Sequence, residues 1–264
     1  MSLIRIPGAL KVPARIAGVF WALKLFTTAF GESTSDYLVH NVNPYVAVAV
    51  GFVLFLVAMT LQLRSTRYVP WVYWLAVAMV AVFGTMAADV LHVEFRVPYV
   101  ASALLFAVVL AVVFSSWSRL EPTLSIHSIT TRRRELFYWA AVLATFAMGT
   151  ALGDLAAYTF KLGFLSAGIV FAILFALPGV AYYALRTNAV LAFWAAYVMT
   201  RPLGASFADW TGKSTRAGGL GIGDGPIAAV LALLIVAGVL FITVSRSART
   251  DTGELEPMLA EETG

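Results

Sequence analysis

The sequence predicts an all-α polytopic membrane protein whose eight transmembrane helices form four tandem helical hairpins in a pseudo-fourfold arrangement. Composition is the first observation behind this class, because 61% of the residues are apolar, 12% are charged and the mean hydropathy is +0.86. A soluble domain carries about 25% charged residues. The second observation is the spacing Trp-x9-Gly-x4-Asp, which occurs four times within apolar stretches of the chain.

Eight apolar stretches are long enough to cross a bilayer as helices, which takes roughly 20 residues each. They lie at approximately 16–40, 45–63, 71–92, 98–117, 136–160, 163–185, 189–211 and 226–245. The alternating segments of roughly ten residues that are typical of a membrane barrel are absent. The first stretch holds one copy of the repeated spacing, so we interpret it as a retained helix and not as a cleaved signal peptide.

Each repeat combines one helix that carries the motif with one plain apolar helix. The four copies of the motif are Trp21/Gly31/Asp36, Trp74/Gly84/Asp89, Trp139/Gly149/Asp154 and Trp194/Gly204/Asp209. Because a unit of two spans returns the chain to the side from which it started, all repeats are expected to share one orientation. The aspartates are therefore expected at similar depth, and the plain helices are expected to face lipid.

We expect a single transmembrane domain at 1–244, followed by a disordered cytoplasmic tail at 245–264. The repeats are placed at approximately 15–64, 68–117, 133–186 and 188–244. The arginine-rich segment 118–135 is predicted to be the main cytoplasmic loop.

The distribution of lysine and arginine predicts the orientation of the chain in the bilayer. Segments on the side of the N-terminus carry 12 of these residues and the opposite loops carry 4, which places both termini in the cytoplasm. The net charge of +4 follows from this topology, so no nucleic-acid partner is expected. The chain has no cysteine, which excludes disulfides and thiolate metal sites. The oligomeric state is left open.

The repeated positions share one face of each motif helix. At 100° per residue, the motif tryptophan and the positions 3, 7, 10, 11 and 15 residues after it fall within an arc of about 140°. Glycine allows close approach of helices, and tryptophan is typical of the membrane interface, so both are assigned mainly to architecture. Position +11 is polar in three of the four copies, namely Glu32, Thr85 and Thr150.

The carboxylates are the candidates for function. An unpaired carboxylate inside a membrane costs several kcal/mol, and each motif aspartate also lies toward a helix C-terminus, whose dipole disfavours negative charge. Because an unfavourable aspartate recurs at the same position in all four repeats, we expect the aspartates to share a cationic partner. The candidate cation-binding residues are Asp36, Asp89, Asp154, Asp209 and Glu32, and the candidates for charge pairing or gating are Lys24 and Arg201.

Oxygen ligands favour hard cations such as Mg²⁺, Ca²⁺ or Mn²⁺, so the four aspartates are also the candidate metal ligands. His40 and His92 are weaker candidates for an imidazole contribution. No resident cofactor is expected, because the cation would be transported or reversibly bound. No residue is assigned a catalytic role.

Several longer segments around the motifs have a distinctive sequence. They are Phe20-Trp21 with Lys24 and Gly31-Glu32, Tyr138-Trp139 with Gly149-Thr150, Phe193-Trp194 with Thr200-Arg201-Pro202-Leu203-Gly204-Ala205, and Gly218-Gly219-Leu220-Gly221. In these segments the chain resembles the bacterial membrane-anchored proteins, a family built from four tandem two-span repeats of a domain of unknown function. The resemblance covers nearly the whole chain and implies this fold in a bacterial inner membrane, without implying an activity. Asp224 stands where the family is expected to have threonine or serine.

Three classes of function fit these residues. The leading hypothesis is an inner-membrane transporter of a small cation, either a divalent metal ion such as manganese or an organic cation, with proton coupling as an option. The unequal charges at Lys24 and Arg201 favour a carrier over an open pore. The alternative is a structural or partner-binding membrane protein in which the aspartates stabilise helix packing. An intramembrane enzyme is the third class and the least favoured, since it needs two carboxylates within hydrogen-bonding distance, directly or through one water.

Overall fold

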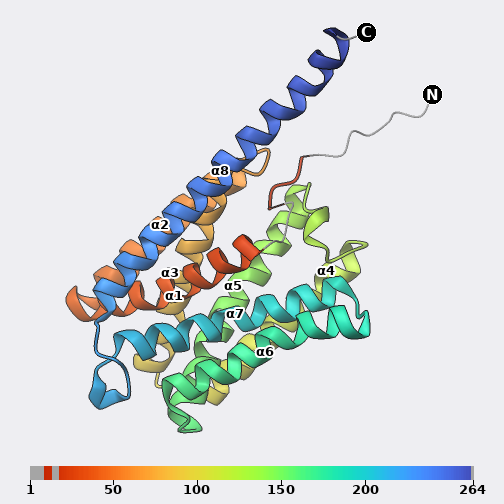
Figure 1. Cartoon of the computed structure of the whole chain (residues 1–264). Coiled ribbons are helices and arrows are strands. Elements are labelled where there is room, and N and C mark those ends of the chain that lie inside the picture. The colour runs from red at the N-terminus through yellow and green to blue at the C-terminus, as the bar shows by residue number, and fades with distance from the viewer. Residues whose placement is uncertain (1–8, 14–17, 263–264) are drawn as a thin grey trace.

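Helices are the only regular secondary structure in the residues described by the computed structural model, 9–13 and 18–262, with backbone only at Val93 and beyond residue 245. Figure 1 shows the arrangement of the long helices. They are α1 (Gly18–Asn41), α2 (Pro44–Arg64), α3 (Pro70–Val93), α4 (Tyr99–Leu120), α5 (Arg132–Asp154), α6 (Gly163–Leu185), α7 (Ala189–Gly212) and α8 (Asp224–Glu262). Short helical turns lie at η1 (Ile126–Ser128), η2 (Leu155–Thr159) and η3 (Thr215–Ala217).

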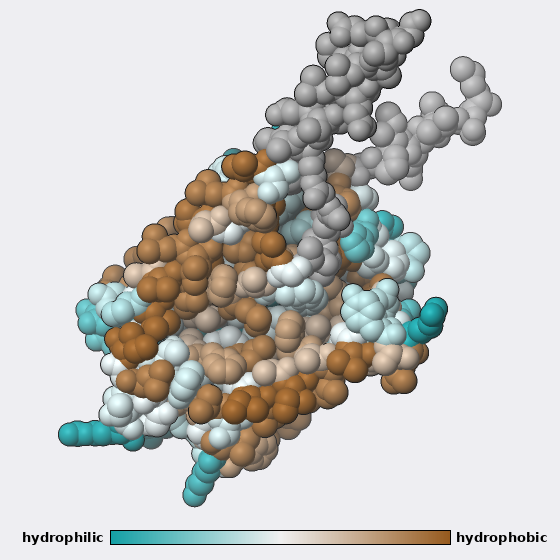
Figure 2. Space-filling view, viewed as in Figure 1, coloured by the Kyte–Doolittle hydropathy of each residue, from teal (hydrophilic) through white to brown (hydrophobic). Residues whose placement is uncertain are grey.

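Each of the eight predicted apolar stretches contributes one long helix, and six helices are long and apolar enough to span a membrane: α2 to α6 and α8. This is the composition of a membrane protein, and apolar side chains cover most of the face seen in Figure 2. The other two, α1 and α7, carry the buried charges Lys24, Glu32, Arg201 and Asp209. The predicted start at residue 16 lies outside the described residues. The repeat boundaries and the disordered tail stay predictions.

Polar caps and proline set several helix ends. The Asn43 side chain accepts hydrogen bonds from the first backbone N–H groups of α2, and Asn188 does the same for α7. Thr131 caps α5 in the same way. These contacts satisfy donors that have no partner within the helix. At its other end, α6 is followed by Arg186 in the left-handed region, with a φ of 53°.

The four motif helices form a closed ring. Among these inner helices, α1 contacts α3, α3 contacts α5, α5 contacts α7, and α7 returns to α1. The plain helices lie outside this ring, and the spanning windows of α2, α4 and α6 are mostly exposed. Their exposed apolar surface agrees with the prediction that they face lipid.

The predicted packing of two helices into a hairpin within each repeat is wrong. The outer helices α2, α4 and α6 pack mainly against α3, α5 and α7, the inner helices of the following repeat, and α8 packs mainly against α1. The two helices of a single repeat contact each other much less. The loops between repeats are nearly as short as those within them. Loop length therefore does not distinguish packing on the inner helix before an outer helix from packing on the inner helix after it.

The motif glycines form the junctions of the ring. A Cβ atom added at Gly31 would collide with Ala81 of α3, and one at Gly149 would collide with Arg201 of α7. The corresponding contacts are Gly84 with Phe146 and Gly204 with Thr28. In all four junctions the partner lies seven residues after the tryptophan of the next repeat. The predicted role of these glycines in close helix approach is thus confirmed, and the contact is cyclic.

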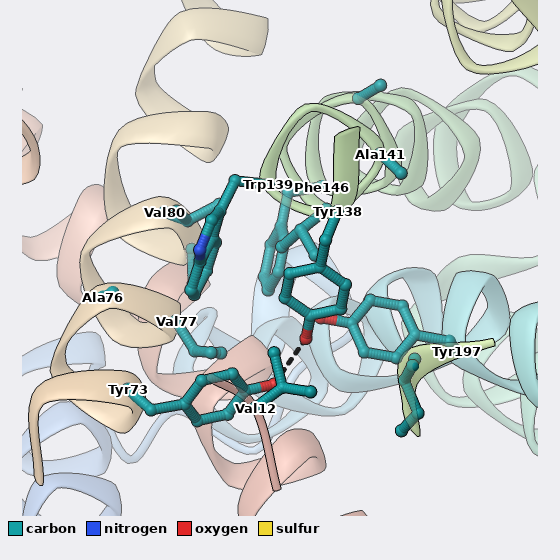
Figure 3. Packing of buried hydrophobic residues seen from close by; sticks show 14 of the residues in the cluster. Val12, Tyr73, Ala76, Val77, Val80, Tyr138, Trp139, Ala141, Phe146 and Tyr197 are labelled. Carbon is teal, nitrogen blue, oxygen red and sulfur yellow. Dashed lines mark hydrogen bonds between the residues drawn. The ribbon is translucent and has the colours of Figure 1, made fainter. Parts of the chain in front are cut away.

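The tryptophans do not form the predicted belt at the lipid interface. Trp74 is 1% exposed and Trp139 and Trp194 are 4% exposed, because aromatic side chains from several inner helices pack together at one end of the ring. Figure 3 shows Tyr73, Tyr138 and Tyr197 converging there, with a hydrogen bond of 2.5 Å between the Tyr73 and Tyr138 hydroxyls. Trp74, Trp139 and Trp194 are therefore core residues of the ring, whereas Trp21 is only partly buried at its edge.

The segment before α1 covers this aromatic end. Val12 is 1% exposed and lies beneath the tyrosines. Beside it, the Lys11 ammonium forms an ion pair of 2.7 Å with Glu135, whose side chain is fully buried. The Gln62 amide donates to the same carboxylate at 3.1 Å. An ion pair and an apolar side chain therefore close this end of the ring.

A second ionic contact joins the loop after α4 to α5. Glu121 accepts hydrogen bonds from Arg133 at 2.6 Å and from Arg134 at 2.7 Å. The hydrogen bonds from Arg134 and Arg133 hold the pKa of the Glu121 carboxyl below its usual range.

This contact predicts an acid-dependent stability. A lowered native pKa stabilises the fold above the pKa of an unfolded glutamate, about 4.3, and the contribution is lost as pH falls through the native pKa. Glu121→Gln is therefore expected to unfold at lower temperature than the wild type at pH 7, with the gap shrinking in acid. Thermal unfolding of both proteins in detergent at pH 7 and pH 3 measures this, and a gap that is equal at both pH values would contradict it.

Candidate functional site

Arg201 is the centre of a buried polar network that joins all four inner helices. The residue is 0% exposed and lies within α7. Its Nη2 group donates to the Glu32 carboxylate of α1 at 2.5 Å and to Thr150 of α5 at 2.8 Å. It also donates to Thr85 of α3. The three polar residues at position +11 thus meet on one guanidinium, which confirms that this face points into the ring.

Carboxylates gather beside this network. Side-chain oxygens of Glu32, Asp36 and Asp209 all lie within 4.8 Å of one another. The Lys213 ammonium, just after α7, lies 2.5 Å from Asp36 and 3.8 Å from Asp209. Asp209 is 6% exposed, so this group of charges is largely removed from solvent. Residues from the first and fourth repeats form this part of the site.

The other two motif aspartates complete the acidic group from α3 and α5. Asp89 interacts electrostatically with Asp154, Glu32 and Asp36, and Asp154 interacts in turn with Glu32 and Asp36. Asp89 and Asp154 therefore share an electrostatic environment with Glu32, Asp36 and the Arg201 guanidinium. The helix after Asp154 widens into the π-helical turn η2, a feature found frequently at functional sites.

Lys24 does not join the carboxylates. Its side chain is 1% exposed, and its ammonium lies 3.9 Å from the centre of the Phe146 ring and 4.2 Å from that of Tyr197. Among the described residues, none accepts a hydrogen bond from it. Aromatic faces attract a cation, so Lys24 is held by two rings where a carboxylate was expected. Arg201 therefore pairs with Glu32, whereas Lys24 lies at the aromatic end of the ring, against Phe146 and Tyr197.

The two histidines that were considered as ligands make local contacts. His40 Nδ1 lies 2.7 Å from the Asp36 carbonyl oxygen, and His92 Nδ1 lies 2.9 Å from that of Val97. Neither belongs to the group of converging carboxylates. Two apolar cavities of about 430 and 420 Å³ also lie beside α6 and α7, and none of the five carboxylates lines them.

The glycine-rich loop after α7 holds Lys213 in place. Backbone N–H groups of this loop donate to the last carbonyls of α7, with Leu220 to Trp210 at 2.7 Å and Ile222 to Thr211 at 3.1 Å. Gly218, Gly221 and Gly223 have positive φ angles, which glycine adopts without strain. The loop therefore caps α7 and fixes the backbone from which Lys213 reaches the aspartates.

Lys213 is the site residue that sequence reasoning missed. It was counted only among the cations of the outer loops. Lys213 lies four residues after Asp209, which is about one helical turn. This spacing could have indicated that the two side chains lie close enough to pair. The shared cationic partner predicted for the aspartates is found for Asp36 and Asp209, and it comes from outside the helices.

Comparison with known sequences gives the relationship of the chain. A family described as Repeat of Unknown Function (DUF347) matches residues 19–68, 72–123, 137–188 and 192–248. The chain belongs to this family. No curated protein and no solved structure matches it. The four DUF347 repeats each contain one motif helix and one outer helix, so the repeat seen in the sequence is the repeat of the family, and the resemblance stated from its motifs is confirmed.

The ring contacts show how DUF347 repeats depend on one another in this chain. The outer helix of one repeat packs on the inner helix of the next, so no repeat buries its own apolar surface alone. The acidic site is likewise shared, because Glu32 and Arg201 come from the first and fourth repeats. The packing of the inner ring and the Arg201–Glu32 pair therefore depend on more than one repeat.

Proposed function

We propose that the protein is a membrane carrier for a small cation, which binds among Asp36, Asp89, Asp154, Asp209 and Glu32. The observation that supports this most is the convergence of Glu32, Asp36 and Asp209 within 4.8 Å inside a ring of largely apolar helices, with Asp89 and Asp154 interacting electrostatically with the same group. Burying such groups is costly, and a ring of acidic side chains attracts cations. The cation is a substrate in this proposal, and the protein has no resident cofactor and no catalytic residue.

The proposal includes the placement of the chain in a membrane. Eight helices would cross a bacterial inner membrane with both termini in the cytoplasm, as the distribution of lysine and arginine favours. The four inner helices would surround a pseudo-fourfold axis. Support comes from their closed contacts and from the equivalent glycine junctions in all four repeats. The acidic group would then face outward, and the aromatic end with Val12 would face the cytoplasm.

Two closed ends fit a carrier better than a pore. At the acidic end, Lys213 is paired with Asp36, and at the other end Lys11 is paired with Glu135. Between them, Arg201 and the aromatic residues around Lys24 fill the interior of the ring. A carrier exposes its site to one side at a time, so such ion pairs would open in turn. Proton coupling through the carboxylates is compatible with this arrangement.

Transport by reconstituted protein tests the proposal. In proteoliposomes, wild type is expected to take up Mn²⁺ or methylammonium, and a variant with all four motif aspartates changed to asparagine is expected to fall to the level of empty liposomes. The physical reason is the loss of the negative charge that offsets dehydration of the cation. Glu121→Gln, which changes a carboxylate far from the site, serves as the matched control and should transport normally.

The opposite result would favour the structural alternative. If the quadruple variant folds and retains both uptake and cation affinity, the aspartates serve only helix packing. The same conclusion follows if wild type takes up neither cation while the quadruple variant is strongly destabilised. Size-exclusion profiles and unfolding temperatures of each variant separate a loss of transport from a loss of fold.

A further inference from the structure

Lys213 places a primary ammonium group inside the acidic site. Its nitrogen lies 2.5 Å from Asp36 and 3.8 Å from Asp209, and these two carboxylates also lie close to Glu32. The side chain is 20% exposed, so it reaches inward from the protein surface. The site as described is thus already occupied by one cation, and this cation is covalently attached to the chain.

The ammonium of Lys213 is held in its charged form. Burial lowers the pKa of Lys213, but the nearby Asp36 and Asp209 carboxylates outweigh this effect and raise that pKa above its ordinary value. Asp224 adds to the same effect from the start of α8. One oxygen of Asp224 is buried, has no hydrogen-bond partner among the described residues and lies against Gly212, the residue before Lys213.

The surroundings suit an ammonium better than a bare divalent metal ion. Glu32, Asp36 and Asp209 are the three carboxylates that lie close together. Glu32 already forms an ion pair with Arg201, so Asp36 and Asp209 are the two that can accept hydrogen bonds from a bound cation. A divalent ion would lie close to a fixed guanidinium charge. Asp36 and Asp209 are thus the two carboxylates in contact with the Lys213 ammonium, which shows that this part of the site accommodates a primary ammonium group.

We propose that Lys213 is a tethered mimic of the cargo: the carrier transports a small primary ammonium ion, which must displace Lys213 from Asp36 and Asp209 to enter the site. The inference rests on the proposed function and specifies its substrate class and its outer gate. The loop of residues 213–223 is hydrogen-bonded to the end of α7, so displacement would move the Lys213 side chain while the loop backbone stays in place. Lys213 thereby competes with the cargo: when no cargo is bound, its ammonium closes the site and neutralises part of the negative charge of Asp36 and Asp209.

Binding of methylammonium and of Mn²⁺ to full-length protein in detergent, measured by isothermal titration calorimetry, tests this inference. Lys213→Met keeps most of the side-chain volume and removes the charge. If Lys213 occupies the site for at least nine-tenths of the time, its removal is expected to strengthen methylammonium binding by about tenfold or more. Mn²⁺ should show no comparable gain. Arg216→Met is the control, because Arg216 is an exposed cation of the same loop.

Three outcomes would overturn the inference: unchanged methylammonium affinity in a folded Lys213→Met protein, an equal gain for Mn²⁺, or an equal gain in Arg216→Met. Lys213→Ala repeats the measurement if the methionine variant does not fold. The proposed function is judged separately by uptake. If uptake depends on the aspartates but Lys213→Met binds methylammonium no more tightly than wild type, the protein is a carrier for another cargo. If Lys213→Met binds methylammonium more tightly but wild type takes up no cation, the protein has an ammonium site and is not a carrier.

Discussion

Arg201→Leu is expected to lower the free energy of unfolding by about 3–5 kcal/mol, the cost of breaking a buried ion pair by removing one partner. The guanidinium is fully buried and is the hydrogen-bond donor to Glu32, Thr85 and Thr150. Without it, Glu32 keeps a charge with no partner, and two hydroxyl groups lose a donor. No other single side chain in the described residues connects all four inner helices in this way.

The double variant Arg201→Leu/Glu32→Leu is the matched control for this prediction. Replacing both members of a buried ion pair by apolar residues is often close to neutral, so the double variant should recover a large part of the lost stability. Unfolding temperatures in detergent, with loss of the monodisperse peak in size exclusion as a second readout, measure both proteins. If the double variant were as unstable as Arg201→Leu alone, the cost would come from packing around Arg201 and not from the unpaired carboxylate.

Gly31→Ala is the second change with a large expected effect, and it should destabilise the protein by about 1–3 kcal/mol, the usual cost of overpacking. An added Cβ would lie 2.7 Å from the backbone carbonyl carbon of Ala81, so α1 and α3 would have to separate. A flexible side chain could move aside, but a backbone atom cannot do so without shifting its helix. The effect should therefore extend to the neighbouring junctions of the ring.

Gly179→Ala provides the comparison, because a Cβ at this position in α6 meets no atom within 4 Å. Alanine is the better helix former, so this variant should be as stable as wild type or slightly more stable. Parallel unfolding measurements on both variants separate close packing from helix propensity. Equal unfolding temperatures for Gly31→Ala and Gly179→Ala would show that the α1–α3 junction tolerates an added methyl group.

The secondary structure could be predicted closely because apolar length and repeated spacing are local properties of the chain. All eight predicted stretches contain a long helix, and caps such as Asn43 and Asn188 lie where the apolar stretches begin. The pairing of helices could not be predicted, since each outer helix has an inner helix on either side in the chain and the apolar pattern does not distinguish them. Trp74, Trp139 and Trp194 were wrongly placed at the interface for a related reason. Indole suits both an interface and a packed ring, and only the arrangement of helices decides between them.

The candidate site was predicted in part. The shared face of the motif helices identified the groups that converge, including Glu32, Arg201 and the two threonines at position +11. Helical periodicity could not predict the separation of Lys24 from the acids, because Lys24 and Arg201 lie on equivalent faces of different helices. Lys213 was missed since it belongs to a loop, whose course depends on the positive φ angles of its glycines and on the carbonyls that it caps.

The pairing of Glu32 with Arg201 has a consequence for how the chain is made. Its two members are 169 residues apart, and they belong to the two long helices that are not apolar enough to be recognised as spans on their own. Ribosomes synthesise α1 first, so Glu32 has no guanidinium partner until α7 has been added. Insertion of α1 into lipid before then would carry the full cost of an unpaired carboxylate. If α1 crosses the membrane, its stable integration is therefore expected to wait for α7, which lies late in the chain.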